Sequence, residues 1–346
     1  MSFLLVGNYG VGNAGDEILR EYFLERFPEV TWEVLSANPD LRELHRFPGG
    51  IRSLISFQWV RTLRALKKAD GMVFGGGSLW TDLESIRACL LWSVHAAFAR
   101  LCGKPYFLAF QGIGPFRTRV GEWLARWVIA HASFTSVRDP GSWGRIEEWK
   151  KNTKVIQSFD PSLLLLEAKK TDLRTKNLFI FIPRFSTGWD ASVRTKFLDC
   201  FRALQEKGFT LRILSLHPDD PREALLCQSL AEPLRIPVEK IASLQNLPPL
   251  LVGATAVMSE RYHGALSALA VEVPFLALRK EKGDKLDVLA EMCGCPSETI
   301  ATFSLQKLLA VDWRERTREL LSVRGQCEEL VRVGEEALHV HLTHGD

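Results

Sequence analysis

Three side chains capable of acid–base and anion chemistry lie within four residues of the second half of the chain. Glu260, Arg261 and His263 follow an apolar run, and a small-residue helical pattern over 264–270 comes next. A strand that ends in such residues and turns into a helix presents them at the carboxyl edge of a sheet, where open α/β folds bind ligands. Backbone N–H groups at the helix start also attract anions. We interpret this stretch as a binding site rather than a salt-bridged turn that only caps a helix.

A second polar cluster follows the first apolar run of the chain, residues 3–6. Its glycines occupy positions 7, 10, 12 and 15, which match neither the dinucleotide fingerprint nor the phosphate loop of nucleotide-binding proteins. Glycines in a strand–loop–helix unit let the backbone approach a ligand closely. The polar residues of this cluster suit a hydroxyl-rich ligand: Asn8, Asn13, Asp16 and Glu17. The two acids also fit a purely structural role, because acids in a first helical turn favour the helix dipole.

Other polar residues fall at the ends of further predicted strands in the first half. A glycine run over 75–77 leads to Asp82, Gln111 follows the next strand, and Arg138 and Asp139 follow the one after. Each loop alone is more typical of a structural turn. Because the carboxyl ends of parallel strands meet at one edge of a sheet, the loops together predict a polyol-binding edge.

The second half offers a cationic counterpart. Arg184 follows one predicted strand and His217 another, and Arg261 and His263 follow a third. Two guanidiniums and two imidazoles suit a small dianion or trianion, since arginine binds carboxylate and phosphate bidentately. His217 is equally compatible with a structural loop histidine.

Composition limits the class of protein. The chain has 346 residues, enough for two domains, and its net charge of +3 with interleaved acids and bases gives no argument for a nucleic-acid partner. Seven cysteines without a paired C-x-x-C spacing argue against a disulfide framework or a structural zinc site, so we expect metal-independent chemistry. No apolar run reaches the roughly 18 residues that span a bilayer, and the N-terminus lacks a signal-peptide pattern. We expect a cytoplasmic protein.

Strand and helix patterns alternate along most of the chain, which predicts parallel sheets with helices on both faces. The strands expected in the first half are 3–6, 31–35, 71–74, 106–110, 134–137 and 154–156, with helices at 18–26, 58–68, 85–101, 119–132 and 142–150. Those expected in the second half are 178–182, 210–216, 256–259 and 275–278, with helices at 191–207, 222–230, 241–251 and 264–269. We expect two Rossmann-like domains, 1–166 and 178–311, facing each other across a cleft. A linker (167–177) and a C-terminal helix (312–346) complete the chain.

Taken together, these motifs resemble the polysaccharide pyruvyl transferase family. The matching segments are 12–17, 75–82, 111–115, 136–139, 160–161 and 261–264, in the order found in the family. The resemblance implies a glycosyltransferase-B-like (GT-B) architecture and transfer of pyruvate from phosphoenolpyruvate to a sugar as a ketal, without any cofactor. The family often has leucine where this chain has Tyr262.

The resemblance and the residue types together suggest roles. Arg184, Arg261, His217 and Glu260 are expected to bind phosphoenolpyruvate, and His263 is the candidate general acid. Asp16, with Glu17 as its substitute, is the candidate general base. The residues expected on the acceptor-sugar side are Asn8, Asn13, Asp82, Gln111, Arg138 and Asp139.

Two other functions fit the same residues: a nucleotide-sugar glycosyltransferase of this architecture, and a non-catalytic sugar-binding protein. The acceptor is expected to be a glycan or a lipid-linked glycan. Residues 57–68 combine aromatic, aliphatic and basic side chains at helical spacing. Such a helix can lie in an anionic membrane interface, which predicts peripheral contact with the inner face of the plasma membrane, although a solvated surface helix fits the pattern as well.

Overall fold

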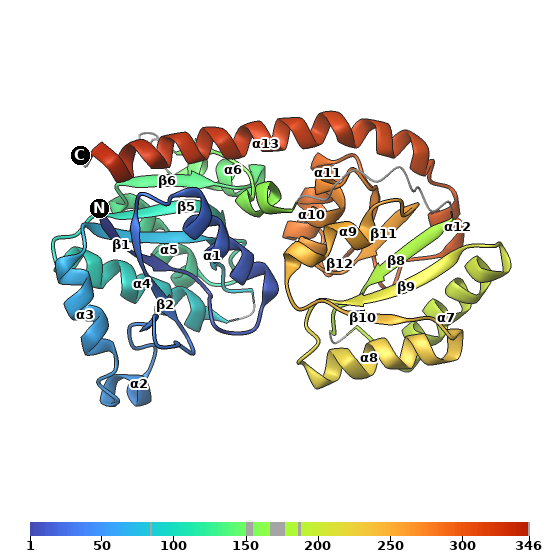
Figure 1. The fold of residues 1–346 in the computed structure, drawn as a ribbon, viewed down its shortest axis with the longest axis horizontal. Helices are drawn as coiled ribbons and strands as arrows, with labels where there is room; N and C mark the ends of the chain where they lie inside the picture. The colour runs from blue at the N-terminus through green and yellow to red at the C-terminus, as the bar shows by residue number, and fades with distance from the viewer. Residues whose placement is uncertain (84, 150–154, 167–176, 186–187, 345–346) are drawn as a thin grey trace. The chain divides into compact units, whose positions relative to one another are not determined.

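The computed structural model describes residues 1–83, 85–149, 155–166, 177–185 and 188–344 (Figure 1). The chain divides into two compact units, one made of Met1–Ser162 with Cys327–Asp346 and the other of Leu163–Gln326. Of the predicted linker 167–177, only Asn177 lies within the described residues, and Lys154, expected to begin a strand, lies outside them.

Within the described residues, the first unit contains a seven-stranded sheet in the order β3-β2-β1-β4-β5-β6-β7, with parallel pairing throughout. Its strands are β1 (Ser2–Val6), β2 (Thr31–Ser36), β3 (Leu44–His45), β4 (Gly71–Trp80), β5 (Tyr106–Ile113), β6 (Phe134–Val137) and β7 (Ile156–Gln157). The helices are α1 (Ala14–Arg26), α2 (Ile51–Ile55), α3 (Trp59–Lys68), α4 (Ile86–Leu101), α5 (Arg119–His131) and α6 (Pro140–Trp149).

The second unit, as far as it is described, repeats this plan with a six-stranded parallel sheet in the order β10-β9-β8-β11-β12-β13. Its strands are β8 (Leu178–Ile182), β9 (Thr210–Ser215), β10 (Val238–Lys240), β11 (Ala256–Ser259), β12 (Phe275–Arg279) and β13 (Ser297–Thr299). The helices are α7 (Ala191–Glu206), α8 (Pro221–Ala231), α9 (Pro248–Leu251), α10 (Tyr262–Ala270), α11 (Lys285–Met292) and α12 (Leu305–Leu309), followed by α13 (Trp313–His344). The prediction of two Rossmann-like units is therefore confirmed.

Several local predictions are wrong. The glycine run 75–77 is not a loop after a strand, because β4 continues to Trp80 and Gly77 still pairs with Gln111 of β5. Gly76 and Gly77 have φ of 79° and 89°, a region that glycine enters without steric cost. The single helix expected over 241–251 is instead a short 3₁₀ turn and the four-residue α9, because Pro248 and Pro249 cannot donate the hydrogen bonds of a helix interior.

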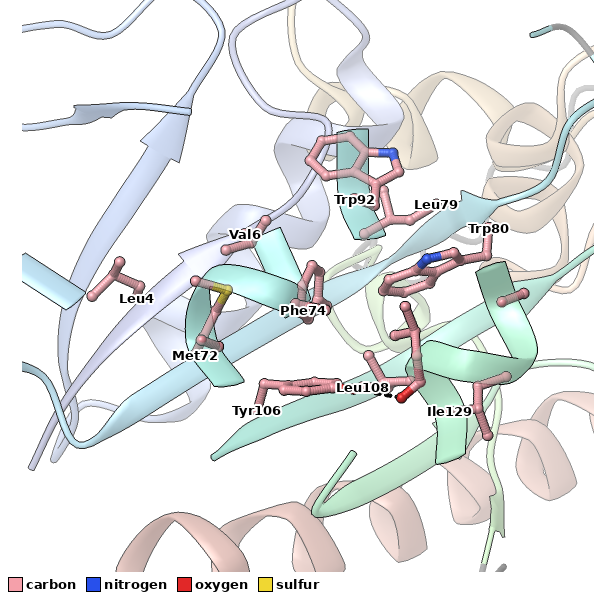
Figure 2. Packing of buried hydrophobic residues seen from close by; sticks show 14 of the residues in the cluster. Leu4, Val6, Met72, Phe74, Leu79, Trp80, Trp92, Tyr106, Leu108 and Ile129 are labelled. Atoms are coloured by element: carbon pink, nitrogen blue, oxygen red, sulfur yellow. Dashed lines mark hydrogen bonds between the residues drawn. The ribbon is translucent and has the colours of Figure 1, made fainter. Parts of the chain in front are cut away.

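The core of the first unit forms where apolar strand residues meet aromatic side chains (Figure 2). Phe74 and Trp80 of β4 are fully buried with ring centroids 5.0 Å apart, and the Tyr106 hydroxyl of β5 donates to the carbonyl of Val128 on α5 at 2.6 Å. Such contacts fix β4 and β5 against the helices, and so hold the carboxyl ends of these strands in place.

Helix α13 belongs to both units: its residues up to Gln326 are part of the second unit, and those from Cys327 onward are part of the first. There Glu335 accepts hydrogen bonds from Tyr22 and Arg26 at 2.6 and 2.7 Å. A Cβ on Gly334 would lie 2.4 Å from Ser158 Oγ, so glycine is required for this close packing. In the described part of the chain, no helix is both long enough and apolar enough to cross a membrane.

Candidate functional site

In each unit, several of the predicted site residues lie at the point where the strand order reverses. The order 3-2-1-4-5-6 places this reversal between β1 and β4 in the first unit and between β8 and β11 in the second. Ligands of open α/β sheets bind outside the carboxyl ends of the strands at this point. The polar residues of 7–17 follow β1, Arg184 follows β8, and 260–263 follow β11.

At the first reversal point the structure brings together three of the predicted residues. Asn8 and Asn13 each donate a side-chain N–H to Oδ2 of Asp16, at 3.0 and 2.7 Å. Asn13 also caps α1 by accepting from the Gly15 amide at 3.2 Å. A Cβ on Gly77 would lie 3.7 Å from Asp16 Oδ1, so the end of the glycine run borders this carboxylate. Asp16 is therefore oriented by two amides at the edge of the sheet.

Part of the glycine pattern serves packing rather than a ligand. Tyr9 is buried, and its hydroxyl donates to the Gly75 carbonyl at 3.0 Å. A Cβ on Gly7 would lie 2.3 Å from the Tyr9 ring, and one on Gly75 would lie 2.4 Å from the Tyr9 oxygen. Both glycines thus make room for one tyrosine side chain.

Glu17 has a different environment from Asp16. Its Oε1 accepts from the Gly10 amide at 2.7 Å, and its Oε2 lies 3.2 Å from an Arg20 nitrogen. Arg46, which the sequence analysis missed, binds the same loop by donating to the carbonyls of Gly7 and Tyr9, at 3.1 and 2.6 Å. Burial lowers the pKa of Arg46 from its ordinary value, an effect opposed by the charge of Asp16.

Gln111 lies within β5, which extends to Ile113, and not after the strand as predicted, whereas Arg138 directly follows β6. Both side chains are buried. Gln111 donates to the carbonyls of Phe74 and Ala109, both at 2.9 Å, while its own Oε1 is buried without a hydrogen-bond partner among the described residues. Arg138 forms a buried ion pair with Asp160 and donates to Ser78 Oγ at 2.9 Å. These contacts tie β4, β5 and β6 together just below the edge.

Asp82 and Asp139 both accept hydrogen bonds from residues that lie at or just before the start of a helix. Asp82 accepts from the Thr118 amide and hydroxyl at 2.8 and 2.5 Å and from the Arg117 amide at 2.5 Å. Burial alone would raise the pKa of Asp82, but these hydrogen bonds outweigh burial and lower it. Asp139 accepts from both the amide and the hydroxyl of Ser142 at 2.7 Å, at the start of α6. These bonds fix the loops before α5 and α6.

At the second reversal point, Glu223 joins two of the predicted cationic residues. Glu223 lies on α8 with only 1% of its side chain exposed and forms an ion pair with Arg261. It also accepts from the His217 amide and the Ser215 hydroxyl, both at 2.9 Å. Arg261 Nε is buried with no hydrogen-bond partner among the described residues. Glu223 therefore holds the guanidinium beside the His217 loop and leaves one of its donors unsatisfied.

Glu260 holds the loop that follows β8. Its Oε2 accepts from the Arg184 amide at 2.9 Å and from the Trp189 indole N–H at 3.0 Å. Burial raises the pKa of Glu260 to about 8, although both hydrogen bonds and the charges of Arg261 and Arg184 act in the opposite direction. At neutral pH the group is therefore mostly a neutral carboxylic acid, and it does not cancel the charges of the two arginines.

His263 lies in the first turn of α10, beside Tyr262, with ring centroids 5.2 Å apart. The N-cap residue of this helix is Arg261, whose side chain makes no capping hydrogen bond. Gly264 lets the helix start close to the sheet, because a Cβ there would lie 2.5 Å from Ser259 Oγ. The helix start thus carries His263 next to the Arg261 and Glu260 positions.

Sequence reasoning missed three residues of these sites: Arg46, Glu223 and Trp189. Glu223 and Arg46 lie far in sequence from the groups that they bind, 38 residues from Arg261 and 37 from Tyr9. Glu223 lies in α8 and Arg46 in the loop after β3, and neither belongs to a recognisable sequence motif. The sequence shows only that Glu223 is an acid in the first turn of a helix. Acids are common at that position because they interact favourably with the helix dipole, so Glu223 gave no sign of a functional role.

The sequence profile of the family described as polysaccharide pyruvyl transferase matches residues 13–279. The chain belongs to the polysaccharide pyruvyl transferase family. The matched region includes Asp16 and the whole 260–263 stretch at the two reversal points. No curated protein sequence matches the chain significantly.

Solved structures with similar folds include several that act on or bind nucleotide sugars. A putative UDP-N-acetylglucosamine 2-epimerase from Listeria monocytogenes has a TM-score of 0.66 at 12% identity, covering 99% of this chain and 97% of that chain. Anabaena HepE in complex with UDP-glucose has a TM-score of 0.62 at 11% identity, covering 99% of each chain. MurG of Acinetobacter baumannii has a TM-score of 0.56 at 11% identity, covering 98% of this chain and 99% of that chain. Such identities show the fold alone, which is GT-B.

Among the described residues, no group of three or more His, Cys, Asp or Glu side chains is arranged to hold a metal ion.

Proposed function

We propose that this protein transfers the pyruvyl group of phosphoenolpyruvate to two hydroxyls of a sugar, forming a cyclic ketal and releasing phosphate. The sugar belongs to a surface or cell-wall polysaccharide or to its lipid-linked precursor. Family membership supports the reaction class. The observation that carries the choice of donor is the cationic edge of the second sheet, where Arg184 and Arg261 flank a Glu260 whose pKa is raised to about 8.

The charges of this edge favour a small anion. Glu223 forms an ion pair with Arg261, and burial keeps Glu260 mostly uncharged at neutral pH, so Glu260 adds little negative charge beside the two arginines. The buried Arg261 Nε lacks an acceptor among the described residues. A buried donor without a partner costs about 1–3 kcal/mol, and an anionic oxygen of the donor substrate would recover this free energy.

The proposed reaction has a simple balance. The C2–O bond to phosphate breaks, two sugar hydroxyl oxygens bond to C2, and C3 gains one proton to become a methyl group. Of the two hydroxyl protons, one balances the proton taken up by C3 and the other leaves with phosphate. The reaction therefore needs cations on the carboxylate and phosphate, an acid for C3 and a base for the hydroxyls.

We assign the acid role first to His263, at the start of α10. Glu260 is the second candidate, since a carboxyl group with a pKa of about 8 still holds its proton at neutral pH. The base role goes to Asp16, whose orientation is fixed by Asn8 and Asn13, with Glu17 as its substitute. The donor then belongs to the second unit and the acceptor to the first.

A donor screen tests the proposal. The purified protein is incubated with phosphoenolpyruvate or with UDP-sugars, against a panel of nitrophenyl and lipid-linked glycosides, while phosphate and UDP are measured. We expect acceptor-dependent phosphate release from phosphoenolpyruvate. At substrate concentrations below KM the release should be strongly reduced in Arg261→Ala and retained in Arg202→Ala, an exposed control on α7. UDP release instead would indicate a glycosyltransferase. Sugar binding without release of either product would indicate a non-catalytic sugar-binding protein.

A further inference from the structure

Helix α2 exposes apolar side chains that the fold does not use. Its exposed residues include Ile51, Leu54 and Ile55, with exposed fractions of 76%, 49% and 64%, and Phe57 follows with 68%. No residue of this helix is buried. Ile51, Leu54 and Ile55 share one face of the helix by their spacing, and Phe57 follows two residues later; these four exposed side chains are called the α2 patch below. Exposed apolar side chains grouped in this way mark an interaction surface more often than isolated ones do.

The patch is held in place by its neighbour. The Trp59 indole N–H of α3 donates to the Leu54 carbonyl at 3.0 Å, and the Trp59 ring packs on Phe98 at 5.8 Å between centroids. Figure 1 shows α2 at an outer end of the first unit, next to α3. The patch is therefore presented outward on a fixed support.

The helix predicted to lie in a membrane interface, α3, uses its apolar face differently. Leu66 is buried, and Trp59 and Leu63 pack against the core of the first unit. Its exposed side chains are basic: Arg61, Arg64, Lys67 and Lys68. The apolar surface that remains for a partner is thus the α2 patch, and α3 contributes charge.

The charged residues of the segment that contains the α2 patch are all basic. Residues 47–69 include five Lys and Arg and no Asp or Glu, whereas the whole chain has a net charge of only +3. None of the five forms an ion pair with another described residue. The α2 patch together with these Lys and Arg side chains therefore complements a membrane surface, which has anionic headgroups outside and apolar acyl chains beneath.

We propose that residues 51–57 insert into the interfacial region of an anionic phospholipid bilayer, with the basic residues of 52–68 contacting its headgroups. The occupant is a lipid surface, because a protein partner would have to supply both an apolar pocket and a ring of acids. This proposal does not rest on the proposed function, since vesicle binding is measured without substrate.

The test is flotation of the full chain with vesicles of phosphatidylglycerol and phosphatidylcholine, or of phosphatidylcholine alone. We expect binding only to the anionic vesicles, weakening as salt rises. Each Lys or Arg near an anionic surface contributes about 1 kcal/mol, which is about fivefold in affinity, so Arg61→Glu with Arg64→Glu should lower affinity by at least about 30-fold. Ile55→Ser with Phe57→Ser should lower it by about 10- to 100-fold.

Two matched control variants carry substitutions of the same kind at exposed positions outside residues 51–68. Arg202→Glu with Arg332→Glu alters net charge equally, and Leu225→Ser with Leu321→Ser removes two exposed apolar side chains of the second unit. Both controls should float like the wild type. The proposal is overturned if the wild type does not float with anionic vesicles, or if the 55/57 variant floats as well as its control. Self-association lost in the 55/57 variant, without flotation of the wild type, would make the patch a subunit interface.

Discussion

Glu260 should make the second unit less stable as pH rises, and Glu260→Gln should remove this effect. In the folded protein burial raises the pKa of Glu260 from 4.5 to about 8. Both N–H donors, from Arg184 and Trp189, lie within 3.0 Å of the same atom, Oε2. A glutamine whose carbonyl oxygen takes that place keeps both hydrogen bonds and carries no charge at any pH.

The sign follows from proton linkage. Between pH 4.5 and 8 the folded state holds a proton on Glu260 that the unfolded chain has released. The stabilisation is therefore complete below pH 4.5 and is lost as pH rises to 8. A shift of one pKa unit corresponds to about 1.4 kcal/mol, so the loss between pH 5 and pH 9 amounts to about 3–5 kcal/mol.

The assay is urea unfolding at pH 5 and pH 9. Unfolding of the second unit is monitored by hydrogen–deuterium exchange of peptides from β11 and α10. All other ionisable groups are shared by the wild type and Glu260→Gln and cancel in the comparison. We expect Glu260→Gln to gain stability relative to the wild type by about 3–5 kcal/mol between the two pH values. Parallel pH dependence of the two proteins would refute the reasoning and mean that Glu260 is ionised when folded.

The remaining predictions concern the two edges. Arg184→Ala and Arg261→Ala should both weaken phosphoenolpyruvate binding, measured as KM. The loss should reach roughly 30- to 5000-fold for the half-buried Arg261 and should be smaller for the exposed Arg184. His263→Gln should instead lower kcat by about 10²–10⁴, and a wild-type kcat would move the acid role to Glu260 or His217. Asp82→Ala should destabilise the first unit by about 2–4 kcal/mol in urea unfolding, since the Arg117 and Thr118 donors lose their acceptor; a change under 0.5 kcal/mol would contradict this. Activity should survive chelation by EDTA, and loss restored by a divalent cation would overturn the predicted metal independence.

Much of the fold followed from local pattern. Strands such as 178–182 are continuous apolar runs, and their alternation with helices fixes a parallel sheet. The short edge strands β3, β10 and β13 were harder to predict, because two or three residues carry no periodicity. The extension of β4 through 75–80 was also invisible, since glycines within a sequence usually indicate a turn.

The candidate site, too, was predicted only in part from the sequence. Motif residues at strand ends, such as Asp16 and Arg261, were identified because topology brings strand ends to one edge. The partners that orient them were missed when they came from distant elements, as with Glu223. Sequence alone also does not reveal that Glu260 is held neutral, because its raised pKa depends on burial by residues brought together only by folding.

The most direct test of the proposed reaction is the isotopic composition of its product. Phosphoenolpyruvate and a nitrophenyl glycoside acceptor identified in the donor screen are incubated with the protein in D₂O, and the product is analysed by mass spectrometry and NMR. We predict a pyruvate ketal whose methyl group carries one solvent deuterium, formed in equal amount with phosphate. A product without a deuterated methyl group, or a glycoside extended by a sugar from a UDP-sugar with no reaction of phosphoenolpyruvate, would contradict the account.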